Sequence, residues 1–289
     1  MSSAQRVLVT GAGGYIGRHV VNALLDAGAE VTAVGRSLMP ETVDRRVKVL
    51  SIDLFEPREN VFEALGRPDV LIHLAWESGF NHNAATHMTS LSSHYSFLTQ
   101  MVASGLKQLV VLGTMHEIGY HEGEIDESTP TAPQSLYGIA KDTLRRALEL
   151  HLADKDVVFQ WVRAFYIFGD DEHNQSIFTR ISAAAERGDE TFPFTTGTNK
   201  FDFVHVEELA EQIAAASLQT EIVGVINAGS GEPVSLATQV EKYISENQYS
   251  LQLIYGAYPD RPYDSPETWG NSDKIQAILA ARAAQNRTS

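Results

Sequence analysis

The sequence predicts an α/β fold built around a doubly wound parallel sheet. Short β-branched segments alternate with amphipathic helical segments through the first 164 residues, which is the pattern of repeated strand–helix–strand units. The strand segments are also almost continuously apolar, as expected for parallel strands that are buried on both faces of a sheet.

Composition narrows the class of protein. The 289 residues carry 22 Lys and Arg against 37 Asp and Glu, a formal net charge of −15, which argues against a general nucleic-acid-binding protein because such proteins present basic surfaces. There is no cysteine, so disulfides, thiolate nucleophiles and cysteine-ligated metals are excluded, and no metal site is expected. No long apolar run and no apolar leader are present, so we expect a cytoplasmic protein without a membrane segment.

The first elements follow from local periodicity. Four short apolar runs predict strands at 6–10, 31–34, 47–51 and 69–74. Between the first two strands, apolar residues recur at helical spacing and Gly28 follows as a helix end. The apolar residues of this helix are Ile16, Val20, Val21, Leu24 and Leu25.

The same alternation continues to about residue 164. Predicted helices at 84–104 and 137–153 flank a strand at 108–112, and a strand at 157–163 follows. Beyond this point the regularity ends, and Gly- and Pro-containing loops separate helices near 175–187, 206–218 and 235–246, with a further helix in the last dozen residues. We therefore expect a sheet domain over 1–164 and a smaller C-terminal lobe over 165–289, some of whose segments return to the sheet.

A glycine-rich turn lies between the first predicted strand and helix. Residues 10–17 read TGAGGYIG, so Gly11, Gly14 and Gly17 have the spacing G-x-x-G-x-x-G. Glycine permits positive φ and lets backbone N–H groups approach a pyrophosphate closely, and the helix N-terminus adds partial positive charge. Although a tight turn that binds nothing is the alternative, this position in the chain predicts a dinucleotide-binding turn.

The end of the second predicted strand bears on the choice of dinucleotide. An acidic residue there usually holds the ribose 2′-hydroxyl of NAD, whereas an Arg accommodates the 2′-phosphate of NADP. Here Gly35 and Arg36 follow the strand. The sequence therefore favours NADP, with NAD equally acceptable if Arg36 stacks on the adenine.

A candidate catalytic group occurs on the long helix. Residues 137–141 read YGIAK, which places Tyr137 and Lys141 four residues apart on one helix face. A charged lysine lowers the pKa of a nearby phenol from its usual value of about 10, so that the phenol can exchange a proton with a substrate oxygen. Thr114, after the strand at 108–112, supplies a third polar group. The alternative is an ordinary buried aromatic beside a solvated lysine.

Together these motifs resemble the extended short-chain dehydrogenases/reductases, in the NAD-dependent epimerase/dehydratase superfamily that acts on nucleotide sugars. The matching segments include TGAGGYIG at 10–17, IHLAW at 72–76, GTMHEIG at 113–119, YGIAK at 137–141, KFDFVHVEELA at 200–210 and NAGSGEPVSL at 227–236. The resemblance implies a Rossmann-type fold with Thr114, Tyr137 and Lys141 as the catalytic triad. The implied cofactor contacts are Gly11, Gly14, Tyr15, Ile16, Gly17, Arg36, Asp53, Leu54, Leu74, Ala75, Tyr137 and Lys141.

The resemblance also implies that the C-terminal lobe binds the diphosphate of a nucleotide sugar. Arg261 resembles the late arginine that clamps the diphosphate, a role that suits a guanidinium fork. Tyr166 stands where many relatives have an asparagine, and Asn174 and Ser176 could replace that contact. The candidate substrate contacts are Trp76, His116, Tyr166, Asn174, Ser176, Phe201 and Arg261.

Three reactions suit such a site: reduction of a keto sugar, epimerisation at C4 and dehydration. Dehydration requires an acid and a base beside the sugar. One alignment places Met115, His116 and Glu117 against the Thr-Asp-Glu triplet of dehydratases. In that alignment a methionine stands at the position of the catalytic hydroxyl, and the catalytic acid of the dehydratases is missing. Dehydration is therefore disfavoured.

Arg36 favours reduction, because cells keep NADP reduced for such reactions. The segments IHLAWE and GTMHEIG also resemble reductases of 4-keto-6-deoxy nucleotide sugars. The expected reaction is therefore hydride transfer from NADPH to C4 of such a sugar, with Tyr137 as the proton donor. The alternatives are a C4 epimerase with bound NAD, a small alcohol or carbonyl reductase, and a non-catalytic NADP-sensing regulator. By analogy with relatives, we expect a homodimer.

Overall fold

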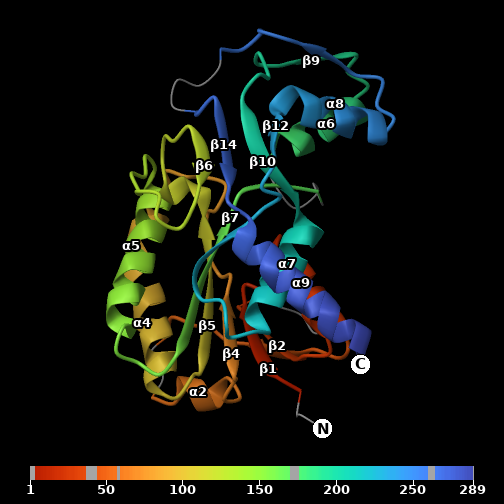
Figure 1. Ribbon diagram of the computed structural model, residues 1–289. Coiled ribbons are helices and arrows are strands. Elements are labelled where there is room, and N and C mark those ends of the chain that lie inside the picture. The colour runs from red at the N-terminus through yellow and green to blue at the C-terminus, as the bar shows by residue number, and fades with distance from the viewer. Residues whose placement is uncertain (1–3, 37–43, 57–58, 170–175, 260–263, 289) are drawn as a thin grey trace.

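The computed structural model describes residues 4–36, 44–56, 59–169, 176–259 and 264–288 (Figure 1). Across these residues, the larger unit is a seven-stranded parallel sheet in the order β11-β7-β5-β4-β1-β2-β3. Its strands are β1 (Arg6–Thr10), β2 (Glu30–Gly35), β3 (Lys48–Ser51), β4 (Val70–His73), β5 (Gln108–Thr114), β7 (Val158–Ala164) and β11 (Gly224–Ala228). The predicted doubly wound α/β fold is confirmed, and its strand order reverses between β1 and β4, where such folds bind ligands.

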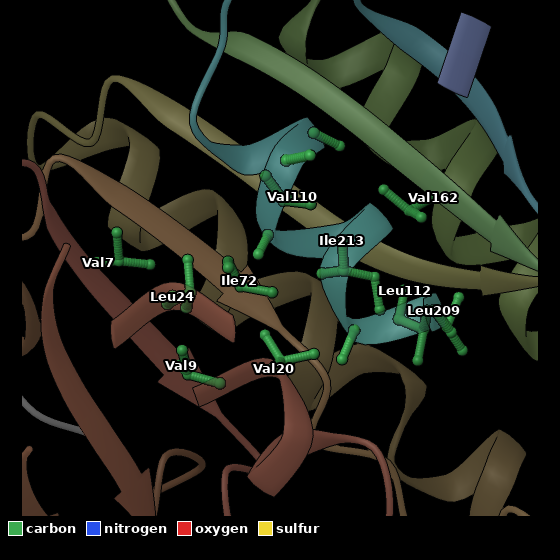
Figure 2. Close-up of a cluster of buried hydrophobic side chains, with 14 of the residues drawn as sticks. Val7, Val9, Val20, Leu24, Ile72, Val110, Leu112, Val162, Leu209 and Ile213 are labelled. Carbon is green, nitrogen blue, oxygen red and sulfur yellow. The ribbon is translucent and has the colours of Figure 1, made fainter. Parts of the chain in front are cut away.

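Helices cover both faces of this sheet. One face carries α1 (Gly17–Asp26), α7 (Val206–Ser217) and α9 (Asp273–Thr288), and the other carries α2 (Val61–Ala64), α4 (Leu91–Ala103) and α5 (Leu136–Leu152). Along β1, Val7 and Val9 face α1 whereas Leu8 belongs to the opposite core, because successive strand residues point to opposite faces. Figure 2 shows the first of these cores, with side chains of α1 and α7 directed at the strands.

A smaller unit lies beyond the carboxyl ends of the strands, at the top of Figure 1. Its main sheet runs β12-β10-β14-β6, with β8 also paired to β10, and β13 pairs separately with β9. These strands are β6 (Gly123–Ile125), β8 (Tyr166–Phe168), β9 (Thr191–Pro193), β10 (Lys200–His205), β12 (Pro233–Ser235), β13 (Gln252–Ile254) and β14 (Glu267–Gly270). Helices α6 (Ile177–Glu186) and α8 (Leu236–Glu246) complete an aromatic-rich core.

Segments cross between the two units in both directions. β6 comes from the first half of the chain but pairs with β14 in the smaller sheet. Conversely, β11, α7 and α9 follow residue 164 in sequence and pack on the larger sheet. No single cut in the chain therefore separates the two sheets. The division into two functional parts at residues 164 and 165 stays a prediction.

Two helices differ from expectation. The predicted helix at 84–104 is divided into α3 (Thr86–Thr89) and α4, which begins at Leu91. The Thr89 hydroxyl donates to the Thr86 carbonyl at 3.5 Å, and such side-chain hydrogen bonds compete with helical backbone bonds. The C-terminal helix α9 is also longer than predicted, since it begins at Asp273.

Candidate functional site

The glycine turn joins β1 to α1 at the edge where the sheet order reverses. Gly11 has φ +70° and its carbonyl accepts a 3.0 Å hydrogen bond from the Gly14 amide. A Cβ on Gly17 would lie 2.1 Å from the Gly11 oxygen, and a Cβ on Gly11 would lie 2.7 Å from the Ala75 nitrogen. The turn therefore requires glycine at both positions. Since no side chain caps the start of α1, its N-terminal amides suit a pyrophosphate.

Other predicted cofactor residues gather around this turn. Leu74 donates its amide to the Thr10 carbonyl at 3.2 Å, and the Tyr15 hydroxyl donates to the Gly169 carbonyl at 2.7 Å, which ties the turn to the segment after β8. Ile16 packs against the core beneath α1. The structure therefore brings the predicted turn residues together with Leu74 and Ala75, an arrangement that fits a dinucleotide.

Two further cofactor candidates follow β3. The Asp53 carboxylate accepts a 2.9 Å hydrogen bond from the Phe55 amide, while Leu54 packs against the core beneath α4. Both follow the end of β3 and so lie at the same edge of the parallel sheet as the glycine turn. Their contact with a cofactor stays a prediction.

Arg36 follows β2 and is engaged by an acid that the sequence reasoning missed. Its guanidinium forms an ion pair with the Glu77 carboxylate, and its carbonyl accepts a 3.1 Å hydrogen bond from the Ser51 hydroxyl. Glu77 follows β4, 41 residues further along the chain. Sequence spacing gave no signal for this pair, because the sheet order alone brings the ends of β2 and β4 to either side of β1.

The three candidate catalytic residues converge at the ends of β5 and α5. Thr114 closes β5, and Ser135 caps α5 by accepting a hydrogen bond from the Gly138 amide at 3.1 Å. This cap starts the helix just before Tyr137, whose side chain is hydrogen-bonded with Thr114. Lys141, one turn later, donates its ammonium to the Leu112 carbonyl at 2.7 Å.

Burial shapes the acid–base properties of this group. It raises the pKa of the Tyr137 phenol, an effect that the Thr114 hydrogen bond partly opposes and that Glu117 reinforces. Burial lowers the pKa of Lys141 to about 7, against the opposing influence of the Glu117 carboxylate. At neutral pH Tyr137 is therefore a protonated group that can donate a proton, and Lys141 titrates in the physiological range.

Glu117 lies behind the catalytic strand end and faces the protein interior. It is fully buried, and it accepts hydrogen bonds of 2.8 Å from both the Thr114 amide and the Trp161 indole. The guanidinium groups of Arg163 and Arg145 lie 3.6 and 3.5 Å away. The sequence carried a signal for this role, since T-x-x-E is a capping-box pattern, and the box is present here.

Five of the ten histidines lie between residues 73 and 116, and of these only His116 is among the predicted site residues. His82 stacks on the Tyr137 ring with centroids 5.3 Å apart, and His116 packs edge-on against His82 at 4.3 Å. Burial lowers the pKa of His116 to about 3, and His82 adds to this shift. Both rings therefore stand beside the phenol, and His116 is neutral.

A second group of histidines, His73, His87 and His94, is buried in the protein. The His73 ring is within hydrogen-bond distance of the Thr10 hydroxyl at 2.9 Å and of the His94 ring at 2.8 Å. His94 stacks on Trp76 at 4.4 Å, and the Trp76 indole donates to His87 at 3.0 Å. Trp76, a predicted substrate contact, is thus held on one ring face and at its nitrogen by protein groups.

The remaining substrate candidates are dispersed. The rings of Tyr166 and Phe201 pack against each other in the smaller unit, with centroids 4.1 Å apart and a tilt of 33°. Only 5% of Phe201 is exposed, and it belongs to the aromatic core of the smaller unit; its contact with a substrate stays a prediction. Ser176 caps α6 by accepting from the Thr179 amide at 3.3 Å. Asn174 and Arg261 lie outside the described residues.

The described ranges contain no cluster of His, Asp or Glu side chains arranged to hold a metal ion. Within the same ranges, every helix is too short or too polar to cross a membrane.

A sequence profile described as the NAD dependent epimerase/dehydratase family matches residues 7–229. The chain belongs to this family. Membership confirms the predicted family and an NAD-dependent enzyme of the oxidoreductase type. Within the family, dTDP-6-deoxy-L-talose 4-dehydrogenase (NAD(+)) from Aggregatibacter actinomycetemcomitans is 39% identical over 269 residues, which cover 91% of this chain and 98% of the relative.

Solved structures of other proteins share the family fold. MoeE5 in complex with UDP-glucose and NAD has a TM-score of 0.77 at 24% identity, covering 95% of this chain and 92% of that one. UDP-glucuronic acid 4-epimerase from Bacillus cereus, in complex with UDP-glucuronic acid and NAD, has a TM-score of 0.79 at 21% identity, covering 96% and 93%.

Proposed function

We propose that the protein reduces the 4-keto group of a nucleotide-linked 4-keto-6-deoxy sugar, with Tyr137 as the proton donor. The observation that carries this proposal is the convergence of Thr114, Tyr137 and Lys141 at the same edge of the sheet as the glycine turn. That arrangement offers a proton donor and a dinucleotide cradle along one edge, as a carbonyl reduction requires.

The choice of substrate is supported by the 39% identical relative. Its name describes oxidation at C4 of a 6-deoxy sugar carried on dTDP. Reduction of the corresponding 4-keto sugar is the same reaction in the opposite direction, so the same residues serve both. The nucleotide carrier and the binding of its diphosphate by the C-terminal lobe are parts of this proposal.

NAD is the dinucleotide that we propose, in place of the NADP favoured by Arg36 alone. The relative's name specifies NAD(+), and both solved structures hold NAD. Gly11, Gly14, Gly17 and Ala75 would hold the pyrophosphate. When bound in its reduced form, the dinucleotide would supply the hydride.

The protein's own groups then complete the reduction. As C4 gains a hydride, its carbonyl oxygen takes the phenolic proton of Tyr137 and becomes a hydroxyl. Thr114 hydrogen-bonds this oxygen, and protonated Lys141 stabilises the phenolate left on Tyr137. The carbonyl carbon is thereby reduced, with one proton lost from the protein.

The histidine pair beside the phenol is the proposed sugar contact. His82 and His116 lie against Tyr137 and against each other. A neutral imidazole has one donor and one acceptor, which matches the hydroxyl groups of a sugar. The pair would therefore orient the sugar toward Tyr137.

A C4 epimerase is the second candidate, since solved structures of the same fold include nucleotide-sugar 4-epimerases. An epimerase returns the hydride to its own substrate and consumes no added reduced cofactor. A small carbonyl reductase would act equally well without a nucleotide on the substrate, and a regulator would bind cofactor without turnover.

The test is incubation of the protein with NADH and a dTDP-4-keto-6-deoxy-hexose while the absorbance of the reduced cofactor is followed. We expect consumption of NADH, reduced about a hundredfold or more in Tyr137→Phe. Consumption at the wild-type rate in Tyr137→Phe would contradict the role of Tyr137. Absence of consumption by the wild-type protein would contradict the reductase.

A further inference from the structure

The ion pair between Arg36 and Glu77 spans the end of a strand. Arg36 directly follows β2, Glu77 lies beyond the end of β4, and β1 runs between these two strands. The carboxyl end of β1 leads into the glycine turn at Gly11. The pair therefore crosses the sheet edge at the place where the proposed dinucleotide enters.

The backbone around this pair is held in place. The Ser51 hydroxyl at the end of β3 fixes the Arg36 carbonyl at 3.1 Å. On the other side, the main chain of Leu74 and Ala75 packs so closely on Gly11 that no Cβ would fit. Arg36 thus projects from a fixed position on one side of the cradle, and Glu77 lies two residues beyond the segment that packs against Gly11 on the other side.

The position of Arg36 is the one at which such folds distinguish NAD from NADP. A residue at the end of the second strand faces the 2′ position of the adenosine ribose, where an acid selects the hydroxyl and an arginine accepts the phosphate. β2 carries no acid at its end. Instead, the Glu77 carboxylate, which follows β4, lies at this place and is paired with the Arg36 guanidinium.

We propose that Glu77 is the residue that makes the site prefer NAD over NADP, by occupying Arg36 and by opposing a 2′-phosphate. This inference rests on the proposed binding of a nicotinamide dinucleotide. A 2′-phosphate would have to compete with Glu77 for the guanidinium and would then lie beside a like charge. A 2′-hydroxyl carries no charge and meets neither obstacle.

The pair is not expected to matter for stability. The side chains of Arg36 and Glu77 are 63% and 44% exposed, and exposed ion pairs contribute little to folding. Its effect is instead a difference between two ligands that differ by one phosphate. A binding ratio is therefore the quantity to measure.

The experiment compares ADP-ribose with 2′-phospho-ADP-ribose by isothermal titration calorimetry, which requires no turnover. The variants are Glu77→Gln, Glu77→Asp and the double variant Glu77→Gln/Arg36→Ala. Glu63→Gln is the matched control. Glu63 lies on α2 and forms an exposed ion pair with Arg67, and α2 precedes β4 and so lies toward the opposite edge of the sheet.

We expect wild-type protein to bind ADP-ribose more tightly than its 2′-phosphate. Glu77→Gln should shift the affinity ratio toward the phosphate by about tenfold. Glu77→Asp and Glu63→Gln should leave the ratio near wild type. In the double variant, the added Arg36→Ala should abolish the shift. An unchanged ratio in Glu77→Gln, or a wild-type preference for the phosphate, would overturn the role of Glu77 while leaving dinucleotide binding intact. Binding of neither ligand by wild-type protein would overturn the proposed function itself.

Discussion

The ammonium nitrogen of Lys141 lies 4.0 Å from the centroid of the Trp76 ring. His94 also stacks on the indole, with ring centroids 4.4 Å apart and an interplanar angle of 20°. Lys141 is only 2% exposed, and a cation over an aromatic face is stabilised most when it is withdrawn from water. We therefore propose that Trp76 positions Lys141, and its contact with a substrate stays a prediction.

This relationship predicts a shift in the pH dependence of catalysis. Burial lowers the pKa of Lys141 to about 7, Glu117 opposes that shift, and the nearby rings of His73 and His94 are neutral at this pH. Removing the aromatic face in Trp76→Leu destabilises the charged form, so the loss of activity with rising pH should move about one unit lower.

The measurement is kcat/KM across pH for the two variants Trp76→Leu and Trp76→Phe. Because phenylalanine retains an aromatic face, Trp76→Phe should stay closer to the wild-type midpoint. A Trp76→Leu profile with the wild-type midpoint and a uniformly lower rate would show that the indole only supports packing.

Removal of the Glu117 carboxylate should lower the stability of the protein strongly. Arg163 is 1% exposed and its guanidinium lies 3.6 Å from the Glu117 carboxylate. Glu117→Ala would leave this charge buried without its partner, which costs about 3–5 kcal/mol of unfolding free energy. Urea denaturation measures this cost. The control is Glu149→Gln, which changes the half-exposed partner of Arg145 and should cost under about 1 kcal/mol. Equal losses of unfolding free energy in the two variants would contradict the role of Glu117 as the buried partner of Arg163.

The buried histidines predict a loss of stability in acid. Burial holds the pKa of His73 well below its usual value and lowers that of His94 to about 3. Above the unfolded pKa of about 6.5 neither ring affects the pH dependence, and as pH falls below it only the unfolded state gains protons. Each ring should then remove about 1.4 kcal/mol per pH unit.

Unfolding free energies at several pH values between about 7 and 5 test this expectation. His94→Asn removes one titrating ring while placing an amide near the position of Nδ1, so its stability should fall less steeply with acid. Parallel curves for the variant and the wild-type protein would mean that His94 is not buried as a neutral ring.

Removal of a ring from the pair His82 and His116 should weaken the affinity for the substrate. His82 stacks on the Tyr137 ring at 5.3 Å, and its carbonyl accepts the Tyr137 amide at 2.9 Å. His82→Ala keeps the backbone bond and removes the ring, so KM for the keto sugar should rise about tenfold with a smaller change in kcat. Steady-state kinetics with saturating cofactor measures both. A fall in kcat at constant KM would instead assign His82 to the chemical step.

Structural features that depend on the local spacing of residues could be predicted from the sequence. The glycine turn requires Gly11 and Gly17 at a fixed separation after a strand, and Tyr137 and Lys141 share a helix face because they are four residues apart. The parallel strands were likewise evident from continuous apolar runs, since both their faces are buried.

Contacts between distant segments were not predictable in this way. Gly123 pairs with Thr268 across the smaller sheet, and these strands are too short to show a period of their own. Glu77 meets Arg36, and His82 meets His116, only because the sheet order juxtaposes the loops that carry them. The prediction of NADP rested on Arg36 alone, whereas the relative and the solved structures name NAD.

In the proposed reaction, hydride passes from a reduced, exchangeable cofactor to C4 of the sugar. The most direct measurement supplies NADH deuterated at C4 of the nicotinamide together with a dTDP-4-keto-6-deoxy-hexose, and locates the label by mass spectrometry and NMR. Two parallel samples carry the two C4 stereoisomers of the label. We predict that one stereoisomer delivers deuterium to C4 of a reduced 6-deoxy sugar, and that Tyr137→Phe forms almost none of this product. A product without deuterium at C4 from both stereoisomers, or an epimerised sugar with no cofactor consumed, would contradict the account.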